Sequence, residues 1–201
     1  GPGVDLSGAD LSGADLSGAD LSGVKSGYIT GVPINLPNPY IIKKGYILGP
    51  NVNLTGADLS GVDLSGAVLS GVTSGGITGG DPINLPISYE IRNGYIIGPN
   101  VNLTGADLSG VNLSGVNLTN TIFVNTDLSG ANLTNAFAPG ANFPSADLTE
   151  ANLSGATLTD ANLIKANLTN ANLTDATLTD ATLIDVTLSG ATLSGANLTD
   201  A

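Results

Sequence analysis

From Val101 to Ala201 the chain repeats one apolar pattern every five residues. Each unit begins with a small residue (Val, Ala or Thr), and a large apolar residue follows two positions later, from Leu103 to Leu198. Seventeen of these twenty later positions are Leu, the exceptions being Phe123, Ala138 and Phe143. A period of five fits neither a helix of 3.6 residues per turn nor a two-residue strand alternation. The pattern therefore predicts a repeat architecture.

The remaining three positions are mostly Ser, Thr, Asp, Asn or Gly, and these residue types favour turns. Units read Ala-Asp-Leu-Ser-Gly at 9–13, Ala-Asn-Leu-Thr-Asn at 131–135 and Ala-Thr-Leu-Thr-Asp at 176–180. They resemble the pentapeptide-repeat family, whose consensus is Ala-(Asp/Asn)-Leu-x-x, and are similar to its cyanobacterial members. The resemblance implies an all-β fold, a right-handed quadrilateral parallel β-helix. In that fold each pentapeptide forms one side of a square coil, with the Leu and the small residue inward.

Two gaps interrupt the repeat between the regular stretches 4–23, 52–71 and 101–201. Each gap contains the run Pro-Ile-Asn-Leu-Pro, at 33–37 and again at 82–86. Because Pro cannot donate a ladder hydrogen bond, we expect two coils to carry loop insertions, at about 32–40 and 80–89. The loops are the predicted interaction sites, with residues Pro33, Ile34, Asn35, Leu36, Pro37, Pro82, Ile83, Asn84, Leu85 and Pro86.

The gaps leave two registers open, because Ile replaces Leu within them. In one, Ile29 and Ile47 occupy the central slot of their pentapeptides, which is the position of Leu in the regular units. Gly27 and Gly45 then occupy the small slot, which is the position of Ala two residues earlier. In the other, the Ile residues take the small slot and Gly49 or Gly98 takes the centre. The side-chain volume is similar in both, so the sequence does not choose between them.

With the loops set aside, the period predicts one domain, 1–201, of about nine coils. The sequence shows no terminal capping helix, and it starts and stops in register. A terminal coil exposes unpaired strand edges and apolar interior. We therefore expect the ends to meet another copy, end to end as in a filament, or to continue into a longer repeat protein.

Three columns of outward residues are predicted on the faces of the coils. One alternates in charge through Asp15, Lys43, Asp63 and Arg92 and continues as Asn112 to Asn172. Another runs through Asp58, Thr78, Asp107, Asp127 and Asp147, and is expected to be a solvated acidic face, with cation binding or a basic partner as the alternative. The third is a predicted exposed apolar patch, Leu48, Val68, Ile97 and Phe137. Such a patch indicates a partner surface, unless the loops fold back over it.

The amino-acid composition limits which catalytic and metal-binding sites the chain can form. Cys, His, Met and Trp are absent, so no thiolate or imidazole exists for catalysis or for zinc. We predict no catalytic residues, no cofactor and no metal site, and hence no enzyme. The net charge of −12 disfavours nucleic acid as a partner. No apolar run approaches the roughly 20 residues of a membrane span.

These observations predict a non-enzymatic structural or protein-interaction solenoid whose partner is a protein, with self-association foremost. The alternative is an acidic DNA mimic. The resemblance implies it, because some members of the family resemble B-form DNA and bind a type II topoisomerase such as gyrase. Those members favour Phe at the central slot, whereas this chain uses Leu.

Overall fold

Parallel pairing between residues about one coil apart forms the backbone of the structure, a computed structural model that describes residues 1–201. Asn132 pairs with Asn112 on one side and with Asn152 on the other. The bonds around it are Asn132 N to Val111 O, at 3.0 Å, and Leu113 N to Asn132 O, at 2.7 Å. This ladder of backbone hydrogen bonds between coils defines a parallel β-helix, and the chain contains no α-helix. The predicted all-β class and parallel pairing are confirmed.

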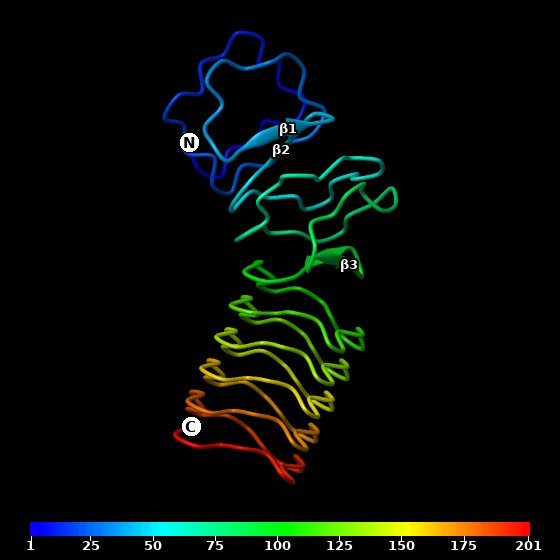
Figure 1. Ribbon diagram of the computed structural model, residues 1–201, viewed down its shortest axis with the longest axis vertical. Coiled ribbons are helices and arrows are strands. Elements are labelled where there is room, and N and C mark those ends of the chain that lie inside the picture. Colours follow the sequence, from blue (N-terminus) through cyan, green and yellow to red (C-terminus); the bar gives the residue numbers. More distant parts are fainter. The chain divides into compact units, whose positions relative to one another are not determined.

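The chain divides into two compact units, Gly1–Ile96 (unit 1) and Ile97–Ala201 (unit 2). Within unit 2, coloured green to red in Figure 1, coil follows coil with the same offset. The Leu side chains fill the interior of its coils, and Leu153 has no exposed surface. Thr121 and Thr126 replace Ala in the small slot, and their buried hydroxyls donate to the Gly98 and Leu103 carbonyls at 2.8 Å.

Each pentapeptide ends in a β-turn that makes the corner of the coil. The Ala9 amide donates to the Leu6 carbonyl at 3.0 Å, and Gly8 inside the turn has φ +72°. Asn135 takes the same place with φ +55°. A positive φ at this turn position favours Gly and is tolerated by Asn and Asp. The last position of the repeat is therefore mostly Gly, Asn or Asp.

Where Asp or Asn precedes the central Leu, its side chain braces this turn. Asp10 Oδ1 accepts the Ser12 amide at 2.9 Å and the Ser12 hydroxyl at 2.6 Å. Asn132 Oδ1 accepts the amide and the hydroxyl of Thr134 at 3.0 and 2.6 Å. These local bonds are the ones that make Asx residues good turn formers. The outward polar columns of the sequence are thus structural parts of the corners.

Two short strand pairs lie in the former gaps. β1 (Ile41–Lys43) pairs antiparallel with β2 (Tyr46–Leu48), with Ile42 opposite Ile47. β3 (Glu90–Arg92) pairs with β4 (Tyr95–Ile97) in the second copy. Lys44 and Gly45 between β1 and β2 both have positive φ, which is the backbone of a type I′ hairpin turn. Figure 1 shows β1 and β2 side by side.

The ladder settles the register of the loop-bearing coils. Thr30 pairs with Asp10, which precedes a central Leu, so Ile29 lies in the small slot. Thr78 pairs with Asp58 and places Ile77 in the same way. The structure thus has the second of the two registers, and the reading of Ile29 as a central residue is wrong.

Ser26 and Gly31 hold central slots of the first loop-bearing coil instead of Leu, and β2 lies beside Ser26. Ile47 of β2 is completely buried, and its amide donates to Ser26 Oγ at 2.9 Å. Ile96 and Ser74 repeat the contact at 2.9 Å. The two copies of the gap thus hold their second hairpin strand through the same Ser-to-amide contact.

Candidate functional site

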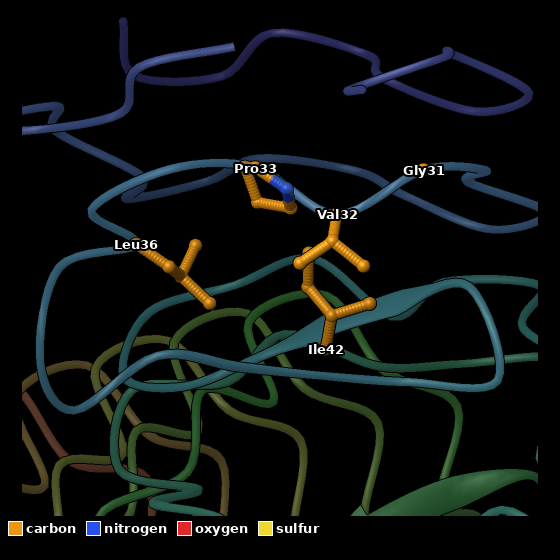
Figure 2. Close-up of a pocket in the computed structure, with 5 residues that line it drawn as sticks. All are labelled: Gly31, Val32, Pro33, Leu36 and Ile42. Carbon is orange, nitrogen blue, oxygen red and sulfur yellow. The ribbon is translucent and has the colours of Figure 1, made fainter. Parts of the chain in front are cut away.

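A small apolar cavity opens between the first Pro-Ile-Asn-Leu-Pro run and β1. Its volume is about 260 Å³, and it is lined by Gly31, Val32, Pro33, Leu36 and Ile42. We call these five residues the first loop pocket. Figure 2 shows the side chains of Val32, Leu36 and Ile42 around a common space. The pocket offers shape and apolar surface but no charged side chain.

The Pro-rich runs begin inside the ladder, which corrects the expectation that they leave the coil. The Ile34 amide donates to the Ala14 carbonyl at 2.7 Å, and the Leu16 amide to the Ile34 carbonyl at 2.9 Å. Ile83 pairs with Asp63 in the same way. Pro is tolerated at both places because the amide that the ladder uses belongs to the following Ile.

Amide side chains fasten the next residue of each run to the coil before it. Asn35 Nδ2 donates to Asp15 Oδ1 at 3.2 Å, and Asn84 Nδ2 donates to Asp63 Oδ1 at 3.0 Å. Beyond them the chain turns, with the Tyr40 amide bonded to the Pro37 carbonyl at 2.9 Å. The residues that depart from the coil are therefore fewer than the sequence predicted.

The second copy of the gap forms an equivalent cavity of about 360 Å³, the second loop pocket, with Pro82, Leu85 and Ile91 in the places of Pro33, Leu36 and Ile42. Its rim differs, because Asp81 takes the place of Val32. Arg92 and Glu90 form an ion pair there, at 2.8 Å. Burial raises the pKa of Tyr89, which also lines it. One architecture thus presents an apolar pocket and a charged one.

Large apolar side chains are exposed around these pockets. Val32 is 81% exposed and Ile87, in the turn after Pro86, is 95% exposed. Ile34 and Ile83 are each about half exposed. The repetition of the two runs makes them identifiable in the sequence. No sequence pattern, however, indicates which of their residues are exposed to solvent.

The predicted apolar patch is wrong at two of its four positions. Leu48 and Ile97 are fully buried, because they lie in β2 and β4, and Ile41 of β1 pairs with Leu48. Both residues lie in hairpin strands, so the four positions do not form a continuous exposed apolar patch. Val68 and Phe137 are partly exposed but belong to different units.

The acidic column is present within unit 2, where Asp127 pairs with Asp107 and with Asp147. The column of alternating charge is not formed, since Ile34 and Ile83 lie beside Asp15 and Asp63 in the places predicted for Lys43 and Arg92. Hydrogen bonds from the Ser65 amide, the Asn84 side chain and the Ser65 hydroxyl lower the pKa of Asp63, with a smaller contribution from the charge of Lys43.

The carboxylates serve turns and do not converge on one point. The hydroxyl of Ser12, followed by its amide, lowers the pKa of Asp10, and Ser109 lowers that of Asp107 in the same way. No group of three or more His, Cys, Asp or Glu side chains is arranged to hold a metal ion. None of the chain forms a helix of the length and apolarity needed to cross a membrane.

Comparison with known proteins adds the following findings. A family model described as pentapeptide repeats matches eight copies, over residues 2–25, 51–73, 100–135, 126–163 and 161–200. No curated protein matches. Among solved structures, a pentapeptide repeat protein from the Arabidopsis thaliana thylakoid lumen is 41% identical, with 45% of this chain and 63% of that chain covered and a TM-score of 0.44. The match thus spans less than two thirds of that protein's length.

Two further structures align over more of the chain. HetL, a pentapeptide repeat protein involved in heterocyst differentiation regulation from the cyanobacterium Nostoc, is 24% identical, with 99% and 91% of the chains covered and a TM-score of 0.27. QnrB1, a plasmid-mediated fluoroquinolone resistance protein, is 17% identical, with 75% and 73% covered and a TM-score of 0.40.

Proposed function

Because the chain belongs to the pentapeptide repeat family, we propose that it is a non-enzymatic interaction solenoid that binds a protein partner through its two loop pockets. The duplicated pocket carries this proposal. The same five-residue run builds both cavities, and each has an exposed apolar residue beside it. Exposed apolar surface rimmed by polar residues is characteristic of protein-binding sites.

The two pockets favour a partner that presents two apolar side chains. Ile34 and Ile83 belong to corresponding sides of their coils, since they pair with Asp15 and Asp63. The first loop pocket accepts an apolar side chain without a charged neighbour in its lining. The second adds Asp81, Glu90 and Arg92, which supply hydrogen bonds that orient a polar flank of the partner. Together they would recognise an extended segment.

Site-specific photo-crosslinking tests the proposal. A photoreactive amino acid at Ile87, which is 95% exposed, should capture one partner from the native lysate, and mass spectrometry identifies it. The matched control is Ile184, which is 60% exposed in unit 2. Val32→Asp should abolish capture while the circular dichroism spectrum stays unchanged. Equal capture at both positions, or capture that survives Val32→Asp, contradicts the proposal.

Self-association belongs to the same proposal, with the chain regarded as one solenoid of about nine coils. Each coil offers the next the same row of backbone donors and acceptors, so a second copy has matching geometry. Light scattering across a concentration series measures it. A molar mass of 19.8 kDa at every concentration contradicts self-association.

DNA mimicry toward a topoisomerase such as gyrase is the alternative, and the net charge of −12 favours it. A gyrase supercoiling assay with the purified protein separates the two functions. Dose-dependent inhibition supports mimicry, and no effect leaves protein interaction through the loop pockets.

A further inference from the structure

Tyr28 combines high exposure with an unfavourable backbone conformation. Its side chain is 75% exposed, and its φ is +55°. The other non-Gly residues with positive φ are Asn, Asp, Ser, Lys or Glu, so Tyr28 is the one aromatic residue among them. A bulky side chain in this region is an outlier, and such outliers concentrate at functional positions. Gly76 holds the equivalent corner of the second copy with φ +60°. Folding alone would therefore favour Gly at position 28.

A cavity of about 200 Å³ lies beside this side chain. Its polar lining residues are Ser7, Lys25, Ser26, Tyr28, Tyr46 and Thr55, with Gly and Ala as the remainder. We call it the tyrosine pocket. Its lining holds one cation, five hydroxyl groups and no carboxylate, in a chain with seventeen acidic residues. Hydrogen-bond donors are thus concentrated at one place on an acidic protein.

The inner wall of the tyrosine pocket is held in place. The ring of Tyr46 lies 6.5 Å from that of Tyr28 at an interplanar angle of 48°, and Tyr46 is buried. The Asp58 amide donates to the Tyr46 hydroxyl at 3.0 Å. Gly27 permits this position, because a Cβ there would stand 3.0 Å from Tyr46 Cε1. The pocket therefore has a fixed aromatic wall and an exposed aromatic residue at its edge.

We propose that the tyrosine pocket binds a neutral sugar residue. The C–H face of a hexose ring stacks on Tyr28, and its hydroxyls bond to Lys25 and Thr55. An apolar ligand would make no hydrogen bond with the Lys25 ammonium or with the hydroxyls of the lining. An anionic ligand would meet the field of a chain with net charge −12, including Asp5, which pairs with Lys25 in the ladder. A neutral polyhydroxyl ligand avoids both penalties.

This site is separate from the loop pockets, with which it shares no lining residue. Its occupancy therefore does not depend on the proposed protein partner. Val32→Asp should leave sugar binding unchanged, and Tyr28 variants should leave crosslinking at Ile87 unchanged.

The test uses the whole chain and a panel of neutral oligosaccharides: maltohexaose, cellohexaose, xylohexaose and chitohexaose. Saturation-transfer NMR and calorimetry measure binding, with oligogalacturonate as the anionic comparison. At least one neutral oligosaccharide should bind, and Tyr28→Gly should weaken it at least tenfold. The melting temperature of Tyr28→Gly should equal or exceed that of the wild type, because Gly relieves the positive φ. Tyr28→Asn tolerates the same backbone and serves as a second variant, and Ile34→Ser is the control.

Three results overturn the inference. The first is that none of the neutral oligosaccharides binds the wild-type chain. The second is undiminished binding to the two Tyr28 variants, which would place the sugar elsewhere. The third is preferential binding of oligogalacturonate that Lys25→Met abolishes, which would make the pocket an anion site.

Discussion

Phe143 stacks on Phe123, with ring centroids 4.7 Å apart and planes 4° from parallel. Both rings are fully buried in central slots that Leu usually fills. Their separation equals the spacing of neighbouring strands, about 4.8 Å, so the coil repeat itself sets the stacking distance. Ala138, which also replaces Leu in a central slot between them in the sequence, is buried as well.

The two rings should be energetically coupled. Phe123→Leu and Phe143→Leu, singly and together, form a double-mutant cycle, and a stacked pair is worth about 0.5–1.5 kcal/mol beyond its burial. Denaturant unfolding followed by circular dichroism measures it. Additive single effects would show that the rings only fill volume.

Leu153 should be far more sensitive than its outward neighbour. Leu153→Ala leaves a cavity and should cost about 2–5 kcal/mol, and Leu153→Asp should cost more because it buries a carboxylate. Asn152→Asp keeps the Oδ1 acceptor that receives the Ser154 amide at 3.1 Å. Thermal unfolding should place this variant near the wild type, whereas a comparable loss for both positions would contradict the assigned inward and outward faces.

Ser26 should contribute to the stability of the folded state through one hydrogen bond. Ser26→Ala leaves the buried amide of Ile47 without its acceptor, and an unsatisfied buried group costs about 1–3 kcal/mol. Ser74→Ala should cost a similar amount through Ile96. Ser194→Ala, at an exposed position, is the control. Unfolding curves in which all three variants coincide would mean that the hairpin strand does not depend on these hydroxyls.

Stability should fall in acid. The pKa values of Asp10 and Asp107 lie below the ordinary value of 3.8, since the folded state donates hydrogen bonds to their carboxylates. A depressed pKa contributes stability above the unfolded value, and this is lost as the pH falls from about 3.8 through the folded pKa. Thermal melts between neutral pH and acid should show the loss. In Asp10→Asn/Asp107→Asn the acid-dependent part should shrink, and an unchanged pH profile would assign the effect to other groups.

Deleting residues 32–40 should destabilise unit 1, because these residues are part of the coil ladder. The deletion removes the ladder bonds of Ile34 and also Tyr40, whose ring packs against Gly49 in a central slot. Ile87→Ser should leave the melting temperature unchanged, because that side chain is 95% exposed. A deletion variant as stable as the wild type would show that residues 32–40 are a loop that the fold does not need.

The sequence by itself determined the coil, its corners and its inward residues. Each regular pentapeptide meets only copies of itself, so the environment of Leu153 or Asn132 follows from the period. The resemblance to the family and the duplicated Pro-rich runs could also be identified from the sequence, because each is a pattern of consecutive residues.

Only the tertiary structure decided what happens where the period fails. Ser26 and Gly49 stand in central slots that lack Leu, and β2 and the Tyr40 ring lie beside them. The sequence could not predict this, because both registers offered a similar side-chain volume. In the observed register Leu48 is buried, Ile34 instead of Lys43 pairs with Asp15, and Tyr28 is exposed beside its pocket. These outcomes depend on contacts between residues without a fixed spacing, and no repeat in the sequence encodes such contacts.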